Sequence, residues 1–357
     1  MSELAVKICK VSEVIKHPNA DKLQLFKLEG YDYQFGSRKD EIALGESVIY
    51  FPIDSVLPTE LADKLSIRKF LGGTSHNRVR CAIFRGEASQ GFICKMNKFD
   101  NLPSSELGTD LTEFFGVTKF EGEINDLPKD GNLVQLPVHV YKYDIDNAEN
   151  RKDVIEYLSN ENIWLSVTEK IEGSHFAATY DVVEDKFTVC QRNFAIVEKE
   201  QGHTWCILAK KYNLENVLKN IVKHYIGFVH NITIRGEVIG PKIQGNYYEL
   251  KEHKILFFEI EIDGKPIDFT SFKNYCTSFG GSDNTIEIVP VLKDINSQEL
   301  KDLNLKTYCT AKSVLIDKLR EGIVIKPRDA EITIMGRHGP ERLIIKQRSP
   351  EYLAKGE

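Results

Sequence analysis

The sequence has no apolar run close to the roughly 20 residues that a membrane-spanning helix needs. Its N-terminus lacks the basic and apolar regions of a secretory signal. The seven cysteines are scattered without a Cys-x-x-Cys pair, which argues against a disulfide framework and against a zinc site of ordinary spacing. The nine histidines show no ligand spacing, and no Gly-x-x-x-x-Gly-Lys phosphate loop is present. We therefore expect an intracellular protein of the cytoplasm or nucleus, with reduced thiols and no membrane contact.

A strong basic excess is also missing, since the formal net charge is −6. That balance argues against a protein that coats nucleic acid non-specifically, although a local groove can still be positive. With 41% hydrophobic and 28% charged residues, the 357-residue chain has the composition of a globular protein, and its length predicts two domains. Nothing in these features indicates a protein partner.

The pattern of the chain divides it into three parts. Residues 1–120 read as short strands at 5–14, 23–28, 46–53 and 80–84, which predicts a small β-barrel or sandwich. Residues 121–135 are polar and broken by Pro128 and Gly131, as in a linker. Residues 136–357 mix strand-like runs with helical patterns at 205–223 and 311–320. The expected class is therefore α+β, with no regular βαβ alternation.

A lysine stands directly after a strand-like run in the second part. The string is Ile163-Trp164-Leu165-Ser166-Val167-Thr168-Glu169-Lys170-Ile171-Glu172-Gly173-Ser174-His175-Phe176. An amine there is a candidate nucleophile for a nucleotide phosphate, provided that nearby cations or a metal ion favour its neutral form. Gly173 has no Cβ, so the backbone can pass close to a nucleotide.

Five more strings follow in a fixed order, each built around an apolar, strand-like run. They supply Arg192 and Asn193, then Glu237, then Phe258, then Glu321 with Val324 and Lys326, and finally Lys346 with Arg348. Glu172, Glu237 and Glu321 are carboxylates at the edges of these runs. Converging carboxylates suit a hard ion such as Mg²⁺ or Mn²⁺.

This succession resembles motifs I, Ia, III, IIIa, IV and V of the covalent nucleotidyltransferases, the superfamily of ATP-dependent DNA ligases, RNA ligases and mRNA-capping enzymes. The resemblance covers about residues 150–350. In the N-terminal part, His17-Pro18-Asn19-Ala20-Asp21-Lys22-Leu23 and Gly45-Glu46-Ser47-Val48-Ile49-Tyr50-Phe51-Pro52 resemble the opening of OB-fold nucleic-acid-binding modules. The expected fold is an N-terminal OB-like β-barrel at 1–120, followed by a ligase-type adenylyltransferase domain with antiparallel sheets and flanking helices at 136–357.

The resemblance also implies roles for individual residues. It implies catalytic Lys170, Lys326 and Lys346; ATP contacts from Glu169, Arg151, Arg192, Phe258 and Val324; RNA contacts from His175, Asn193 and Arg348; and metal binding by Glu172, Glu237 and Glu321.

Two features narrow the family. DNA ligases and capping enzymes usually carry an arginine where this chain has His175, whereas nick-sealing RNA ligases have a polar residue there. An OB module also precedes the nucleotidyltransferase motifs, and few residues follow Lys346. Both features resemble the fifth family of ATP-dependent RNA ligases. Where that pattern has Lys-x-Lys, this chain has Lys346-Gln347-Arg348, and the arginine keeps the charge.

The implied activity is ATP-dependent joining of 3′-OH and 5′-phosphate RNA ends, at duplex nicks, through lysyl-AMP and RNA-adenylate intermediates. ATP and Mg²⁺ or Mn²⁺ are the expected cofactors. Two alternatives remain: a GTP-dependent RNA-capping guanylyltransferase, and an inactive OB-type RNA-binding protein.

Overall fold

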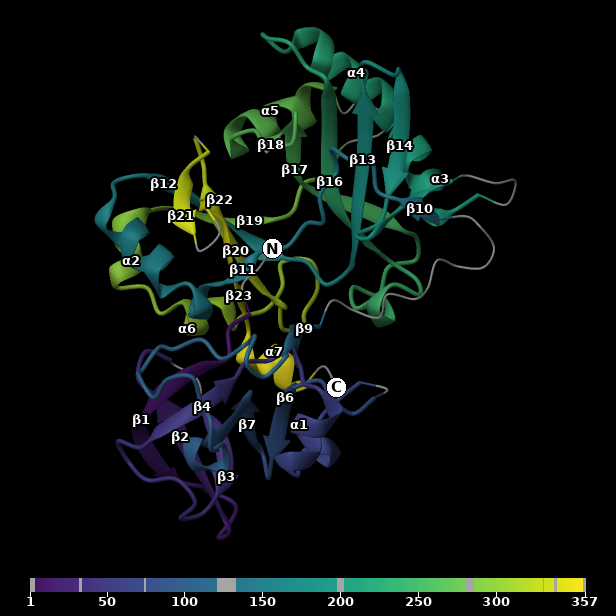
Figure 1. Cartoon of the computed structure of the whole chain (residues 1–357). Coiled ribbons are helices and arrows are strands. Elements are labelled where there is room, and N and C mark those ends of the chain that lie inside the picture. Colours follow the sequence, from purple (N-terminus) through teal and green to yellow (C-terminus); the bar gives the residue numbers. More distant parts are fainter. Residues whose placement is uncertain are drawn as a thin grey trace. The chain divides into compact units, whose positions relative to one another are not determined.

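Two compact units make up the chain in the computed structural model (Figure 1). Ser2–Glu123 together with Leu353–Glu357 form one unit, and Ile124–Tyr352 form the other. The structure describes residues 4–31, 34–73, 75–120, 133–197, 202–279, 286–329, 331–336 and 339–355. Among these residues, no helix is both long and apolar enough to cross a membrane.

The N-terminal unit is built on a five-stranded antiparallel sheet with the strand order β3-β2-β1-β4-β8. The strands are β1 (Lys7–Lys16), β2 (Leu23–Leu28), β3 (Phe35–Arg38), β4 (Ser47–Phe51) and β8 (Phe92–Lys95). Smaller elements are β5 (Ser55–Val56), β6 (Cys81–Phe84), β7 (Glu87–Gln90), β9 (Thr118–Lys119), α1 (Thr59–Lys64), η1 (Arg68–Phe70) and η2 (Met96–Lys98). All four strands expected from the sequence in this part are present within a few residues.

The open edge of this sheet is partly closed by β7. Gly36 N–H donates to Ser89 Oγ at 2.9 Å, and Gln90 N–H donates to the Gln34 carbonyl at 3.0 Å, so β7 lies along β3. Buried apolar residues fill the interior, among them Phe26, Phe35 and Val48. The prediction of an OB-like barrel is confirmed.

The second unit contains two larger sheets. The seven-stranded antiparallel sheet has the order β10-β15-β14-β13-β16-β17-β18. The five-stranded sheet has the order β11-β23-β20-β12-β19. Among its described strands, only β11 and β23 pair in parallel. The strands are β10 (Leu133–Gln135), β11 (Asp146–Asn147), β12 (Trp164–Lys170), β13 (Ser174–Asp181), β14 (Lys186–Cys190), β15 (Phe194–Ile196), β16 (Asn231–Ile239), β17 (Lys254–Ile262), β18 (Lys265–Pro266), β19 (Val291–Asn296), β20 (Gly322–Pro327) and β23 (Ile345–Arg348), with a hairpin of β21 (Thr333–Gly336) and β22 (Gly339–Arg342).

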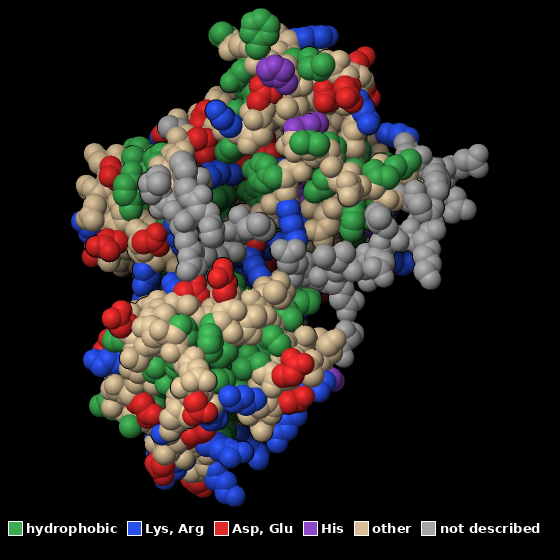
Figure 2. Space-filling model, in the orientation of Figure 1, with side chains coloured by type: hydrophobic (Ala, Val, Ile, Leu, Met, Phe, Trp, Pro, Cys, Tyr) green, Lys and Arg blue, Asp and Glu red, His purple; other side chains and the backbone are tan. Residues whose placement is uncertain are grey.

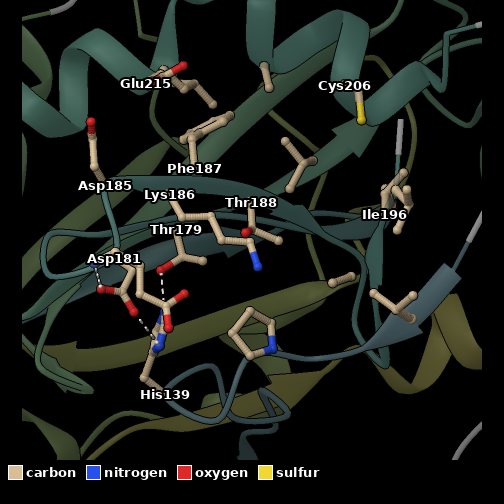
Figure 3. Close-up of a pocket in the computed structure, with 18 of the residues that line it drawn as sticks. His139, Thr179, Asp181, Asp185, Lys186, Phe187, Thr188, Ile196, Cys206 and Glu215 are labelled. Atoms are coloured by element: carbon tan, nitrogen blue, oxygen red, sulfur yellow. Dashed lines mark hydrogen bonds and ion pairs between the residues drawn. The ribbon is translucent and has the colours of Figure 1, made fainter. Parts of the chain in front are cut away.

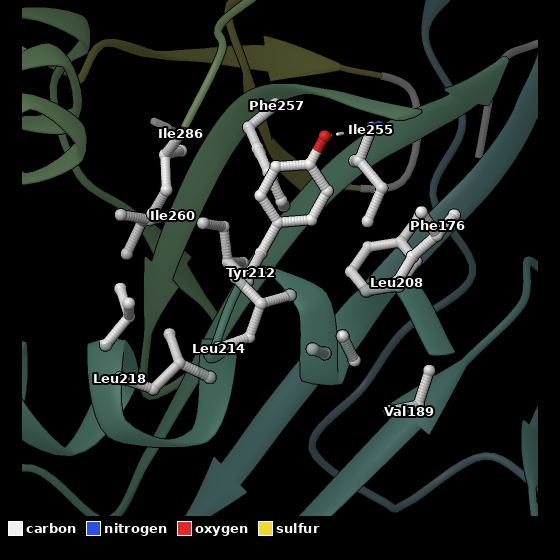
Figure 4. Packing of buried hydrophobic residues seen from close by; sticks show 14 of the residues in the cluster. Phe176, Val189, Leu208, Tyr212, Leu214, Leu218, Ile255, Phe257, Ile260 and Ile286 are labelled. Atoms are coloured by element: carbon white, nitrogen blue, oxygen red, sulfur yellow. Dashed lines mark hydrogen bonds between the residues drawn. The ribbon is translucent and has the colours of Figure 1, made fainter. Parts of the chain in front are cut away.

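Helices cover one face of the seven-stranded sheet (Figure 4). The helices and 3₁₀ turns of this unit and the chain end are η3 (Ala148–Asn150), α2 (Lys152–Asn160), α3 (Thr204–Lys211), α4 (Leu214–His224), η4 (Gln244–Asn246), α5 (Phe269–Phe279), η5 (Ser297–Lys301), α6 (Leu305–Cys309) and α7 (Pro350–Lys355). Leu208 of α3 and Leu218 of α4 pack against Phe176, Ile255 and Phe257 of the strands. Because side chains alternate along a strand, the opposite face of this sheet is free to carry polar groups.

Three expectations differ from the structure. The helical pattern at 205–223 is two helices, because Asn213 adopts a left-handed conformation (φ 51°) between α3 and α4. The predicted helix at 311–320 is wrong: this segment consists of bends, and Arg320 donates instead to the carbonyls of Cys309 and Tyr308. Residues 133–135, expected at the end of a linker, form β10, while residues 121–132 lie outside the described part of the chain.

Candidate active site

Lys170 ends strand β12 and points its amine at a buried carboxylate. Its Nζ lies 2.7 Å from Glu321 Oε2. The β-sheet register explains this contact, because Lys170 pairs with Gly322, the residue that follows Glu321, and Gly322 also pairs with Arg348 of β23. Arg348 Nε lies 3.3 Å from the other oxygen of Glu321. One carboxylate, directly before β20, therefore joins residues from two other strands, β12 and β23, that are far apart in the sequence.

The five-stranded sheet has an apolar face and a face that bears the predicted site residues. Leu165, Val167, Ile323, Ile325 and Ile345 are buried in one cluster on the first face. Side-chain alternation then directs their neighbours to the second face, where Thr168 pairs with Val324 and Val324 pairs with Lys346. This alternation brings Lys170, Val324, Lys326, Lys346 and Arg348 onto a common face.

Two further carboxylates lie close to the first. Glu237, on β16, is paired in register with His175 of β13. Burial raises the pKa of Glu237 to about 8, and the carboxylates of Glu321 and Glu172 contribute to the increase. Burial and then Glu321 raise the pKa of Glu172. For Glu321, burial acts in the same direction but Lys170 and Arg348 outweigh it, so its pKa is lowered.

This donor set fits a divalent ion held at least partly through water. Mutual repulsion among Glu172, Glu237 and Glu321 would be relieved by a nearby cation. No group of three or more His, Cys, Asp and Glu side chains within the described residues is close enough to hold a metal directly. Mg²⁺ commonly keeps several waters and binds through one or two carboxylates and the phosphates of a substrate.

The loop between β12 and β13 is packed tightly against β16. A Cβ built on Gly173 would lie 2.5 Å from the Val238 carbonyl oxygen and 2.6 Å from Glu237 Cγ. Only glycine allows this approach, and the approach brings Glu172 to the side of Glu237. The reason for Gly173 is therefore strand packing around the carboxylates.

A β-bulge directs Phe258 away from the core. Arg235 pairs with Glu259 and Gly236 pairs with Phe257, so Phe258 is the extra residue on β17. Phe257 is buried among the core residues, whereas Phe258 packs with the residues around Ile171 and Tyr248. Bulges commonly redirect a side chain beside a functional site. Here the bulge gives the two neighbouring phenylalanines different roles.

Lys326 is bound beneath Phe258. The residue is only 4% exposed, and its amine donates to the Phe258 carbonyl at 2.6 Å. Burial lowers the pKa of Lys326 to about 8, while the neighbouring Glu259 opposes that change. The residue also lies 4.4 Å above the ring of Phe269. Lys326 is thus a desolvated cation on the face that carries Lys346.

Glu169 has one satisfied and one unsatisfied oxygen. Its Oε2 accepts from the Val314 amide at 3.0 Å, and the residue is only 1% exposed. The Oε1 atom is buried and has no hydrogen-bond partner among the residues that the structure describes. A buried acceptor without a donor is costly, so this oxygen is suited to a donor from a ligand.

Asp144 lies near two of the predicted site residues. It lies 3.7 Å from Lys346 Nζ and 3.6 Å from an Arg192 nitrogen. Asn193 follows at the β14–β15 turn, with a buried Oδ1 that has no partner within the described ranges. Arg151, another of the predicted ATP contacts, directly precedes α2. Arg151 is buried in ion pairs with Asp146 and Asp153, whose distances to it are both 3.0 Å.

His175 lies within the site and not on its outer surface. Its ring is 5.6 Å from that of Tyr143 and 6.1 Å from that of Phe258. Burial and the positive charges of Arg235 and Arg192 lower the pKa of His175 well below its usual value. The histidine is therefore a neutral polar group, as an asparagine would be.

A buried ionic layer beneath His175 was not predicted from the sequence. Arg235 donates to both oxygens of Glu261, and Tyr141 Oη donates to the same carboxylate at 2.5 Å. The guanidinium also lies 4.5 Å from the Tyr141 ring centre. A charged residue in the middle of the apolar run Ile232–Ile239 was a signal for such a layer, but its partners lie on other elements.

A cavity of about 980 Å³ lies at the far end of β13, beside Thr179 and Asp181 (Figure 3). His139 Nε2 is 2.9 Å from Thr179 Oγ1, and its Nδ1 is 4.0 Å from Asp181. None of the predicted site residues lines this cavity. On the face of the N-terminal unit drawn in Figure 2, acidic and basic side chains are interspersed, in keeping with the modest net charge.

Comparison with known proteins gives two family matches. The RNA ligase family profile matches residues 164–347, and an OB-fold domain profile matches residues 5–96. No curated protein sequence matches the chain significantly. The structure is similar to that of Naegleria gruberi RNA ligase with pyrophosphate, with a TM-score of 0.77, 24% identity, and coverage of 99% of this chain and 98% of the other. Two lysine variants of that ligase, one with AMP and manganese and one with ATP and manganese, are equally similar. Each has a TM-score of 0.77 and 24% identity, with coverage of 98% of both chains. These likenesses show a shared fold.

Proposed function

The chain belongs to the RNA ligase family, and from that premise we propose that it is an ATP-dependent ligase that joins 3′-OH and 5′-phosphate RNA ends. The contact of Lys170 with Glu321, on a sheet face shared with Lys346 and Arg348, is the observation that carries this proposal. This arrangement brings together a candidate nucleophile (Lys170), an acid (Glu321) and two cations (Lys346 and Arg348). Attack on phosphate needs these groups together.

Lys170 is the proposed nucleophile. Its nitrogen attacks the α-phosphorus of ATP, the bond to the β-phosphate oxygen breaks, and pyrophosphate leaves. The amine must be neutral to attack, so the ion pair with Glu321 has to open when nucleotide binds. Lys346 and Lys326, on the same face, supply positive charge for the α-phosphate as negative charge develops there.

Glu169 and Phe258 are the proposed contacts for the base. The unpartnered Oε1 of Glu169 would accept a hydrogen bond from the adenine amino group. Guanine has a carbonyl oxygen at the matching position, which a carboxylate would repel. Phe258, directed into the site by the β17 bulge, provides a flat surface for stacking. Adenine is thus favoured over guanine, which argues for ligation over capping.

Mn²⁺ or Mg²⁺ is the proposed metal, held by Glu172, Glu237 and Glu321 through water. Such an ion would supply positive charge to the phosphates and favour the neutral lysine amine. The structurally similar Naegleria ligase variants were solved with ATP and manganese or AMP and manganese, which supports the same choice here.

The second half of the reaction transfers AMP to RNA and then joins the two RNA ends. AMP passes from Lys170 to a 5′-phosphate RNA end, and the 3′-hydroxyl of the other end attacks that activated phosphate and releases AMP. Asn193, Arg348 and the neutral His175 are the proposed RNA contacts. The proposed substrate is a nick in a duplex with RNA on its 3′-OH side, and the proposed division of the chain is an OB-fold domain at 1–120 and an adenylyltransferase domain at 136–357.

Sealing of a labelled nick tests the proposal. Protein stripped of bound AMP would be incubated with a 5′-phosphate nicked duplex, ATP or GTP, and Mg²⁺ or Mn²⁺. We expect joined product with ATP and with RNA at the 3′-OH end. Transfer of GMP to a diphosphate end would instead identify a capping enzyme, and no reaction with either nucleotide would indicate an inactive binding protein.

A further inference from the structure

The C-terminal helix brings a tyrosine back to the loop that follows Lys170. Helix α7 begins two residues after β23, and Tyr352 Oη donates to Glu172 Oε2 at 2.6 Å. The start of the helix is fixed beside the site, because Ser349 N–H donates to the Glu321 carbonyl at 2.8 Å and Tyr352 N–H donates to Ser349 Oγ at 3.2 Å. Residues 180 positions apart in the sequence are therefore in contact.

Other tyrosines support the same loop. Tyr248 Oη accepts from the Glu172 backbone N–H at 2.9 Å. The Tyr352 ring lies edge-on to Tyr247, with ring centres 5.5 Å apart, and Tyr247 Oη is bonded to the Leu319 carbonyl. Glu172 is thus held through its backbone by one tyrosine and through its carboxylate by another.

The Glu172 carboxylate lies among other acids that act on it. Glu321 and Glu237 both lie close enough to affect it electrostatically. A glutamate side chain has three rotatable bonds, so repulsion can turn it to solvent. The Tyr352 hydroxyl bonds one of the two carboxylate oxygens, Oε2, and so restricts the rotation of the side chain. Hydrogen bonds from outside a metal site orient its ligands in this way.

We propose that Tyr352 is a positioning residue for metal-assisted adenylylation, which holds Glu172 in the orientation that binds the hydrated metal. The inference rests on the proposed function, but it assigns a role to the C-terminal helix, which lies outside the motif strings. Tyr352 would act through Glu172 and would not touch the reacting atoms. Loss of an outer hydrogen bond typically weakens metal binding by about 10–100-fold.

The direct test is metal binding without turnover. Mn²⁺ affinity would be measured by electron paramagnetic resonance in the presence of ATP, with Lys170→Met protein as the background to prevent reaction. We expect the added Tyr352→Phe change to weaken Mn²⁺ binding about 10-fold. Tyr157→Phe, which alters a half-exposed tyrosine on α2, is the matched control and should leave the affinity unchanged. Equal affinity in the Tyr352→Phe and background proteins would overturn the inference.

A kinetic test separates positioning from a structural effect. In protein with Lys170, Tyr352→Phe should raise the Mg²⁺ concentration for half-maximal adduct formation about 10-fold, with the saturating rate little changed. A lower saturating rate at an unchanged Mg²⁺ requirement would contradict the proposal. In a Glu172→Gln background the same change should add little, because residues that act through one another are not additive. Adduct formation by the unaltered protein tests the proposed function separately.

Discussion

Replacement of Arg235 by methionine should destabilise the catalytic unit strongly. Arg235 is 1% exposed and donates to Glu261 at 2.7 and 2.9 Å, and Glu261 is also 1% exposed. The same guanidinium reaches the Tyr141 carbonyl at 3.2 Å. Methionine fills part of the volume but leaves the Glu261 carboxylate buried without its bidentate donor.

The size of the effect follows from that burial. Removal of one partner of a buried ion pair costs about 3–5 kcal/mol. In a domain of this size each kcal/mol lowers the unfolding midpoint by roughly 2–4 °C, so the midpoint should fall by roughly 6–20 °C. The double variant Arg235→Met with Glu261→Met should recover part of the loss, since an apolar pair of similar volume can replace a buried ion pair.

Differential scanning calorimetry of the full chain measures this effect. The matched control is Lys293→Met, because Lys293 pairs with Glu299 at 3.0 Å while both side chains are about half exposed. Such surface pairs contribute little, so its midpoint should stay within about 2 °C of the unaltered protein. If the midpoint of Arg235→Met also stayed within about 2 °C of the unaltered protein, the ion pair would not be supporting the site.

Three further substitutions test individual parts of the site. His175→Asn should retain adduct formation and should reduce the loss of thermal stability between about pH 7 and pH 5.5. The reason is that an unfolded histidine takes up a proton below about pH 6.5, whereas the lowered pKa of His175 keeps the folded one neutral. An equal or larger loss of stability in calorimetry would contradict this. Gly322→Ala would put a Cβ 2.2 Å from the Gln347 carbonyl oxygen, so it should destabilise the protein by about 1–3 kcal/mol and slow adduct formation; unchanged denaturant unfolding would count against the packing account. Glu169→Gln should raise the KM for ATP roughly 10–100-fold, as expected for loss of a charged hydrogen bond. It should also reduce the ratio of activity with ATP to activity with GTP. If initial-rate measurements gave an unchanged ratio, Glu169 would not be the contact for the base.

The strands that carry the motif residues were predictable from the sequence for a simple reason. Each candidate group lies in or directly after a short apolar run, and an apolar run with period-two alternation forms a buried strand with one face available for function. Lys170, Val324 and Lys346 therefore came to adjacent strands of a single sheet. In the N-terminal part the short strands indicated a small β-barrel or sandwich, and the resemblance of residues 17–23 and 45–52 to OB-fold modules favoured the barrel.

The contacts that hold these groups in place depend on distant segments and could not be predicted. Nothing near Glu172 indicates that Tyr352 will reach it, and nothing near Arg235 selects Glu261 as its partner. The 311–320 segment has a helix-like pattern, but bonds from its backbone to Glu169 and Tyr247 hold it in bends. The β17 bulge that separates the roles of Phe257 and Phe258 is likewise set by pairing with β16.

The central claim is that Lys170 forms a covalent bond to AMP, and α-labelled ATP tests it most directly. Unaltered protein freed of bound nucleotide would be incubated with the label and Mg²⁺ or Mn²⁺, beside Lys170→Ala, and separated on a denaturing gel. The account predicts a labelled 40.7 kDa band with ATP for the unaltered protein and none for Lys170→Ala. A labelled band of equal strength from Lys170→Ala would contradict it.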